Sequence, residues 1–319
     1  MENTILRNPS KEELKSSISG FCQLSGTMLH EAAISALGQN LGEAHIVPSL
    51  TVHSGYMLGR LYVSSSATDG LTSFSSIVYV VSPTQSLIIL TEDLDTREGP
   101  VFGDLKTIAN ASSSGGELIL GLLKMSVANL SDHIQSVDSQ LAQIQNDVRL
   151  ASTLKLNRAS ELLANCNSRT YPAEIEILGV ELLIFGLEEI GTNLAQDQLD
   201  LRDSTGWEMF GKDLEVTAGE VALQCRQLRA RSSSLIRGLS SIFSEIQRQQ
   251  NENQRGSNRY VSSLAFLVFL PLLMLNFYSQ FFAEGEIWSN NWTTKLFWVV
   301  IVVVEFGSFS FLRARRWLR

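Results

Sequence analysis

Cysteine, histidine and proline are scarce in the sequence, which has three, four and six of these residues among 319. The cysteines, Cys22, Cys166 and Cys225, are odd in number, lie far apart and show no Cys-x-x-Cys spacing. This pattern disfavours a disulfide framework and a zinc knuckle, and it indicates buried thiols in a reducing compartment.

The signatures of common enzymes and of secreted proteins are also missing. We find no Gly-rich phosphate loop, no nucleophile elbow, no His-Glu-x-x-His motif and no paired catalytic carboxylates. Residues 1–17, MENTILRNPSKEELKSS, contain no apolar h-region, so we expect no cleaved signal peptide. The sequence therefore predicts a protein that is not an enzyme and needs no cofactor.

Charged residues are distributed unevenly along the chain. Residues 255–319 contain seven of the 25 basic and three of the 33 acidic residues, so residues 1–254 carry a formal charge of −12. An acidic region repels phosphate backbones and attracts cations, which argues against a nucleic-acid partner.

The basic end of the chain is also its apolar end. Residues 260–283 form a run of 24 residues without a formal charge. As a helix this run would be about 36 Å long, more than the ~30 Å hydrocarbon core requires. Pro271 lies inside it, which membrane helices tolerate. A second, shorter run at 296–312 contains Glu305. We predict transmembrane helices at 260–283 and 296–312.

The flanking charges predict the orientation of these helices. Arg255 and Arg259 precede the first, a basic tail at 313–319 follows the second, and the loop 284–295 has two glutamates and one lysine. By the positive-inside rule, both chain ends face the cytoplasm and the loop faces outward. This is the topology of a multi-pass protein in a bacterial-type inner membrane.

We predict that residues 1–204 form a cytoplasmic α+β domain, a small sheet flanked by helices. Apolar runs rich in β-branched and aromatic residues predict strands at 57–63, 75–81 and 86–91, the last two joined by a Ser-Pro-Thr-Gln turn. Residues 11–42 have a helical pattern. Four glutamates interrupt the Leu- and Ile-rich stretch 175–191, so we expect a buried helix there rather than a third span.

Heptad patterns predict long helices after the sheet. From Leu123 to Val148, apolar residues alternate steps of four and three, which is typical of a helix packed against other long helices. Residues 207–259 lack proline and carry a second apolar seam, so we predict a stalk helix over 205–259 that continues into the first span. A lone stalk would expose its seam, so helices of the same chain, of other chains or of both should cover it. We therefore expect a homo-oligomer in a lipid membrane.

The order of these elements resembles the CorA-type divalent cation channel family, which includes ZntB-like proteins. Residues 76–102, SIVYVVSPTQSLIILTEDLDTREGPVF, are similar to that family's sheet hairpin and the segment after it. Residues 251–271 are similar to its approach to the first span, and RRWL at 315–318 to its basic ending. The resemblance implies a pentameric funnel, a pore lined by residues 260–282 and divalent cations as substrate or regulator.

The family's Tyr-Gly-Met-Asn signature, whose Gly-Met-Asn ring forms the outer cation filter, is absent. With the family's usual spacing from Pro271, the filter position falls on Gln280, Phe281 and Phe282. The sequence Met-Leu-Asn at 274–276 is similar to Gly-Met-Asn, but it lies too early in the helix to occupy the filter position. The resemblance therefore implies a magnesium selectivity that is altered or lost.

Helical spacing predicts which face of the first span would line a pore. This face is polar at its ends and apolar in its middle, and a narrow apolar stretch closes a pore by excluding water. It contains Ser262, Phe266, Leu270, Leu273 and Phe277. The outer mouth and filter position would contain Asn276, Gln280, Phe281, Phe282, Glu284 and Glu286.

Each polar residue of this region has two interpretations. Asn276 and Gln280 are either substitute filter ligands or hydrogen-bonding links between helices. Glu284 and Glu286 either concentrate cations at the mouth or are solvated loop residues. Glu305 costs ~3 kcal/mol inside a span, so it should face protein or water and have a partner, unless it is a protonated packing group.

The stalk offers weak candidates for a regulatory metal site. Asp213 and Glu220 could lie near a metal between protomers, but no metal-ligand spacing supports this and a solvated acidic face is the simpler interpretation. The sequence as a whole predicts an oligomeric inner-membrane cation channel or transporter with an altered or lost magnesium filter. The alternative is a non-transporting CorA-like membrane protein with a regulatory or structural role.

Overall fold

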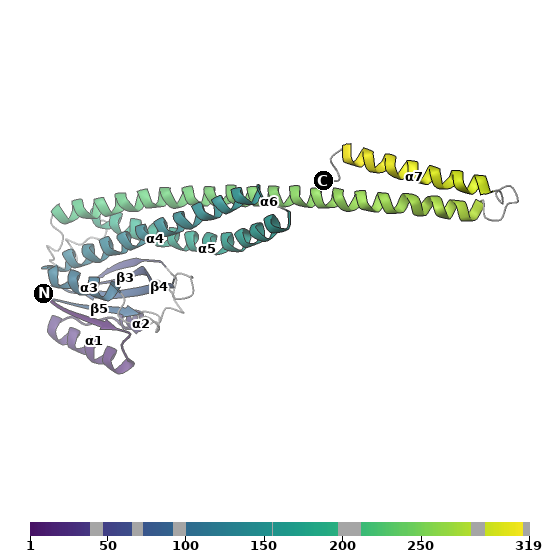
Figure 1. Cartoon of the computed structure of the whole chain (residues 1–319). Coiled ribbons are helices and arrows are strands. Elements are labelled where there is room, and N and C mark those ends of the chain that lie inside the picture. Colours follow the sequence, from purple (N-terminus) through teal and green to yellow (C-terminus); the bar gives the residue numbers. More distant parts are fainter. Residues whose placement is uncertain are drawn as a thin grey trace. The chain divides into compact units, whose positions relative to one another are not determined.

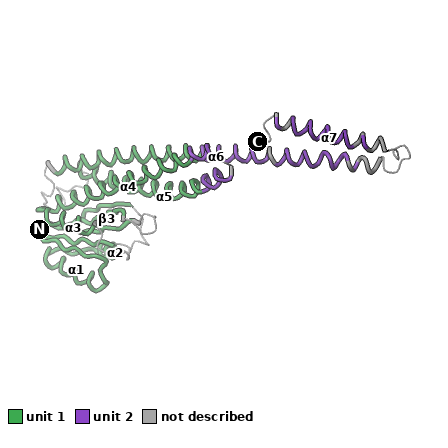
Figure 2. Tube along the Cα trace, in the orientation of Figure 1, with its two compact units in different colours: residues 1–147, 165–243 green, residues 148–164, 244–319 purple. Residues whose placement is uncertain are grey.

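The computed structural model describes residues 1–38, 47–65, 73–91, 100–154, 156–196, 212–281 and 291–314. The chain divides into two compact units (Figure 2). Unit 1 comprises residues 1–147 and 165–243, and unit 2 comprises residues 148–164 and 244–319. The helices are α1 (Lys11–Ser25), α2 (Glu31–Gly38), α3 (Pro100–Ala111), α4 (Gly115–Ala151), α5 (Leu156–Ala195), α6 (Lys212–Phe281) and α7 (Asn291–Ala314).

Unit 1 contains a five-stranded mixed sheet with the order β1-β5-β4-β3-β2. Antiparallel pairing joins β2 through β5, and β1 adds to β5 in parallel, with Glu2 opposite Gln85. The three strands and the turn predicted from the sequence are confirmed, whereas β1 and β2 are additional. The strands are β1 (Glu2–Arg7), β2 (Ser49–His53), β3 (Tyr56–Ser65), β4 (Ser73–Val81) and β5 (Gln85–Thr91).

Helices cover both faces of this sheet (Figure 1). On one face, Phe21 of α1 packs with Val78 and Ile89 in a buried cluster to which α2 also contributes. On the other face, the Ser126 hydroxyl of α4 donates a 2.7 Å hydrogen bond to the Tyr62 carbonyl of β3. Alternate side chains of the central strands therefore face two apolar layers, which explains why these strands read as nearly continuous apolar runs.

Unit 1 also contains α3 and most of the long helices α4 and α5, together with the first part of α6. The predicted seam on α4 is confirmed, because all eight of its apolar side chains from Leu123 to Val148 are buried. α5 and α6 approach closely at Gly191, where an added Cβ would lie 3.2 Å from the Ala222 nitrogen and 3.3 Å from the Ala218 oxygen. The stretch 175–191 is a helix of the bundle as expected, although only one of its faces is buried.

α6 is a single helix of 70 residues from Lys212 to Phe281, with Pro271 inside it. Its residues from Ser244 onward belong to unit 2, together with α7. The predicted continuity of stalk and first apolar run is therefore found within the described range. In unit 2, α7 runs beside the C-terminal part of α6 (Figure 1), and Ser263 and Ile301 are buried.

Candidate pore segment and adjoining pockets

α6 is the one helix among the described residues that is long and apolar enough to cross a membrane, judged by length and composition. The apolar part of α7, Trp298–Ser310, is shorter than that test requires. The predicted span 260–283 coincides with the C-terminal part of α6 up to Phe281, and its last two residues lie outside the described range.

The predicted pore face is largely uncovered in the single chain. Phe266 and Leu273 are each about half exposed, Ser262 is exposed and Leu270 is partly buried. The side chain of Phe277 lies outside the described part of the structure. These residues follow one another at helical spacing, so their Cβ atoms share one side of α6.

The exposed arc of this helix is wider than the predicted pore face. Val261, Leu264, Val268, Phe269 and Leu272 are 42–63% exposed, a range that includes the values of Phe266 and Leu273. Ser263, between these residues on α6, is buried. Exposure in one chain therefore does not distinguish a pore-facing side from a lipid-facing side, and the assignment of the pore face stays a prediction.

Most of the predicted outer mouth falls outside the described residues. This applies to Phe282, Glu284 and Glu286 entirely and to the side chains of Gln280 and Phe281. The side chain of Asn276 is exposed and has an interaction partner. Glu305 of α7 is exposed and makes no hydrogen bond or ion pair with a described residue.

The candidate metal ligands do not form a cluster in the described part of the chain. Glu220 is exposed, and the side chain of Asp213 lies outside the described residues. No group of three or more His, Cys, Asp or Glu residues that could hold a metal ion occurs among the residues described. Acidic residues of α5 are instead bound within unit 1, since Glu188 accepts hydrogen bonds from Arg226 at 3.1 Å and Arg229 at 3.4 Å.

A compact ionic group lies on α6 in unit 2, before its apolar run. Arg248 donates to Glu245 at 2.7 Å and 2.9 Å and to Glu252 at 3.0 Å, and Gln249 donates to Glu245 at 2.9 Å. The hydrogen bonds from Arg248 and then from Gln249 lower the pKa of Glu245 to about 2. These i,i+3 and i,i+4 pairs support the helix where its apolar seam ends.

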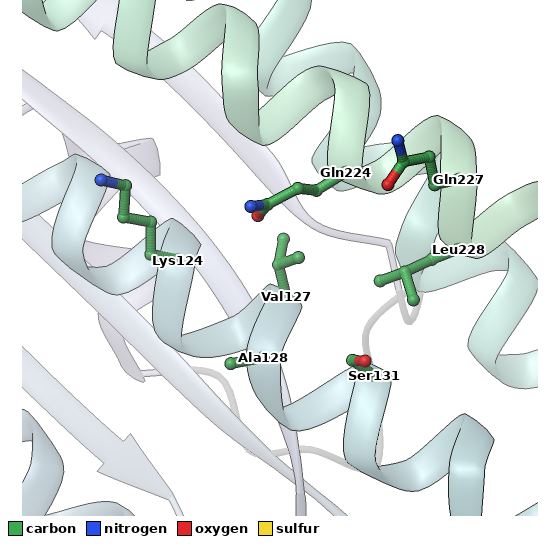
Figure 3. A pocket seen from close by; sticks show the side chains of 7 residues that line it. All are labelled: Lys124, Val127, Ala128, Ser131, Gln224, Gln227 and Leu228. Atoms are coloured by element: carbon green, nitrogen blue, oxygen red, sulfur yellow. The ribbon is translucent and has the colours of Figure 1, made fainter.

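Sequence reasoning did not find two pockets that lie beside α6. In unit 1, a pocket of about 310 Å³ opens between α4 and α6 (Figure 3). Lys124 of α4 lies at its edge, the amide of Gln224 extends from α6 above Val127, and Val127 and Leu228 form its apolar part. Lys124 has no ion-pair partner among the described residues. The remaining lining residues are Ala128, Ser131 and Gln227.

The second pocket, of about 480 Å³, lies in unit 2 between the first turn of α5 and α6. All of its lining side chains are neutral amides or hydroxyls, and those from α6 share one face of the helix because they recur at i, i+3, i+4 and i+7. This pocket can offer hydrogen bonds but no charge. It is lined by Asn157, Ser160, Gln250, Asn253, Gln254 and Ser257.

The CorA class of fold has three parts that are also found here. They are a small mixed sheet between helical layers, a bundle of long helices, and a last bundle helix that continues into an apolar segment. No protein-family model and no curated protein matches the sequence. Solved structures do match. The CorA magnesium transporter from Methanocaldococcus jannaschii aligns with 98% of this chain and 90% of its own, with a TM-score of 0.74 and 13% identity.

Two further solved structures have the same fold. The full-length CmaX protein aligns with 98% of this chain and 88% of its own, with a TM-score of 0.65 and 14% identity. The cytoplasmic domain of ZntB from Vibrio parahaemolyticus aligns with 74% and 84%, with a TM-score of 0.51 and 10% identity. At these identities the likeness shows the fold. The resemblance inferred from the sequence is confirmed at that level.

Proposed function

We propose that this chain forms an oligomeric cation channel or transporter of the cytoplasmic membrane, with altered or lost selectivity for magnesium. The observation that carries the proposal is α6, a continuous helix that belongs to an acidic helical bundle at one end and is apolar and charge-free at the other. One structural neighbour with this fold is a magnesium transporter. The formal charge of −12 on residues 1–254 favours cations over anions near such a pore.

Self-association is part of this proposal. A helix pair such as α6 and α7 cannot enclose a water-filled path by itself, so several copies of α6 must surround one axis. The wide exposed apolar arc of α6 supports this arrangement, because one side of the arc can face lipid and another the axis. We propose a pentamer, by analogy with the family, with α7 as a second span and both chain ends in the cytoplasm.

The proposed gate is the apolar part of the pore face. Rings of Phe266, Leu270 and Leu273 around an axis would exclude water from a narrow pore, which then conducts only when it widens. Such rings offer none of the oxygen ligands that hydrated magnesium prefers. Selectivity would therefore depend on the outer mouth, where the family's Gly-Met-Asn sequence is replaced by Gln-Phe-Phe at 280–282.

Ion flux into liposomes that contain the purified protein tests the proposal. Mg²⁺, Zn²⁺, Co²⁺, Na⁺ and K⁺ are compared, and the double variant Leu270→Ser, Leu273→Ser is measured beside the wild type. We expect the variant to leak, because serine hydroxyls hydrate the constriction. The matched control is Leu264→Ser, Leu272→Ser, which makes the same chemical change on the other side of α6. Equal flux in both variants would remove the gate assignment.

The replaced filter favours a second candidate function, a membrane-anchored regulatory or structural protein that no longer transports. The variant Phe277→Asn separates the two candidates, because it places an amide in the upper part of the proposed pore. Selective flux in the wild type supports a rebuilt filter. Absence of flux in the wild type, together with leak in Phe277→Asn, supports a closed pore in a protein with another role.

A further inference from the structure

A row of large apolar side chains lies exposed on α5 in unit 1. Tyr171, Ile175, Leu178, Leu182 and Phe185 alternate steps of four and three, and each is 47–68% exposed. This spacing is that of a seam between two packed helices. The opposite face of α5 is already buried, so the row is a second seam that no described residue of the chain covers. That buried face contains Ile177, Val180, Leu183, Ile184, Leu187 and Ile190.

The register between α5 and α6 extends this row onto a second helix. Arg226 donates to Glu188 at 3.1 Å, and Ser233 donates to Glu181 at 3.2 Å. A step of seven residues back along α5 thus corresponds to a step of seven forward along α6, as in an antiparallel pair. Ten residues further along α6 and ten further back along α5, the same register places Phe243 near the level of residue 171, and Phe243 is 44% exposed.

These six side chains, Tyr171, Ile175, Leu178, Leu182, Phe185 and Phe243, form the apolar patch. At about 150–250 Å² for a large side chain, and with about half of each exposed, they present roughly 450–750 Å². The largest apolar patch on a typical monomer is ~300–600 Å² and is often functional. One side of a standard protein interface covers ~800 Å². The patch is therefore large enough to supply most of one side of such an interface.

The pocket between α4 and α6 lies on another side of the same bundle. Arg229 of α6 faces the apolar patch, since its guanidinium carbon is 5.3 Å from the centroid of the Phe185 ring. Gln227, which lines the pocket, is two residues away and thus about 200° around the helix. The apolar patch and the pocket thus lie on different sides of the bundle. Two such unlike surfaces suit a head-to-tail contact between copies, which closes into a ring when it repeats.

We propose that the apolar patch of one copy docks against the α4–α6 pocket of the next copy. This inference rests on the proposed function, which requires several copies of α6 around one axis. Ala128, Ser131 and Val127 on the pocket wall have small side chains, so they leave room for the large side chains of the apolar patch. The proposal assigns to each pocket a helix of the neighbouring subunit as its occupant.

The charged residues beside the apolar patch and the pocket favour contact between these two surfaces over contact between two patches. Glu189 continues the exposed row four residues after Phe185, and neither Glu189 nor Lys124 has an ion-pair partner among the described residues. Docking can bring this carboxylate to the Lys124 ammonium at the edge of the pocket. Pairing two apolar patches with each other would instead bring together the glutamates that border them, Glu174 and Glu181. Like charges there disfavour a symmetric dimer.

The first test changes the patch in the full chain. The double variant Leu178→Glu, Leu182→Glu should lower the mass by light scattering in detergent from that of an oligomer to the single chain's 35.3 kDa. Helix content by circular dichroism should stay unchanged, because both side chains are exposed. Leu24→Glu is the matched control, since Leu24 is 64% exposed on α1, and it should keep the oligomer. An unchanged mass in the double variant overturns the proposal.

A second test changes the pocket and does not depend on the patch variants folding. Ala128→Arg fills the pocket at an exposed position and should also yield single chains. Lys124→Glu should raise the dissociation constant about tenfold, and adding Glu189→Lys should restore it. Lys15→Glu on α1 is the charge control and should have no effect. If Lys124→Glu and Lys15→Glu behave alike, the proposed pocket contact is wrong.

These outcomes are separate from those of the transport test. In one outcome, the wild-type oligomer conducts cations while the patch and pocket variants keep its mass. That result would leave the proposed function intact and remove this interface. An oligomer that dissociates as expected, but shows no flux for any cation tested, would keep the interface and remove the transport function.

Discussion

The close approach of α5 and α6 at Gly191 makes a quantitative prediction. A Cβ at this position would lie 3.2 Å from the Ala222 nitrogen and 3.3 Å from the Ala218 oxygen, and both are backbone atoms that cannot rotate away. Valine adds two further carbons to that space. Overpacking of this kind costs about 1–3 kcal/mol. Replacing glycine by valine in a helix gains back only ~0.3 kcal/mol of propensity.

We therefore expect Gly191→Val to lose about 2 kcal/mol of unfolding free energy. At roughly 2–4 °C per kcal/mol, the melting temperature should fall by about 4–8 °C. Thermal unfolding of the purified protein in detergent, followed by circular dichroism, measures this shift. Gly20→Val on α1 is the control, because a Cβ there meets nothing within 4 Å. If the two variants melted within 2 °C of each other, the tight helix contact would be refuted.

Three further predictions concern single side chains. Gly59→Ala should lower the free energy of unfolding by about 3 kcal/mol, because its Cβ would overlap the buried ring of Tyr79 on the neighbouring strand. Denaturant unfolding measures this loss, and a clearly smaller loss would contradict the prediction. Glu245 has a pKa lowered to about 2, so its contribution to stability is present above pH ~4.5 and disappears as the pH falls toward 2. The difference in melting temperature between wild type and Glu245→Gln should therefore vanish at low pH, and a constant difference would contradict this. Burial raises the pKa of the Cys225 thiol to about 12, so maleimide should label the partly exposed Cys22 first and reach Cys225 only after unfolding.

Local periodicity explains which parts of the fold could be predicted. The row from Leu123 to Val148 is buried as expected, because a heptad pattern reports the face of one helix without reference to its partners. β1 was not predicted, since ENTILR is short and polar, and its parallel pairing with β5 depends on residues about 83 positions away. Both pockets were missed for the same reason. Lys124 and Gln224 line one pocket only because helices that are distant in the sequence pack together.

The candidate site shows a different limit. Helical spacing predicts that Phe266 and Leu273 share a side of α6, and backbone geometry supports this. Whether that side faces a pore depends on neighbouring chains, and Leu264 on another side is exposed to a similar degree. The exposed row on α5 was not predicted, because apolar residues occur on both faces of 175–191 and only the structure shows which of them are buried.

The pairing of β1 with β5 has a consequence for biosynthesis. All strands of the sheet have been translated once Thr91 has left the ribosome, because Leu90 pairs with Arg7 of β1 and Thr91 pairs with Ser76 of β4. The apolar run of α6 begins 169 residues later, at Tyr260. At about 5–20 residues per second, translation of that interval takes roughly 8–34 s. The sheet therefore has time to fold before the apolar run of α6 is translated.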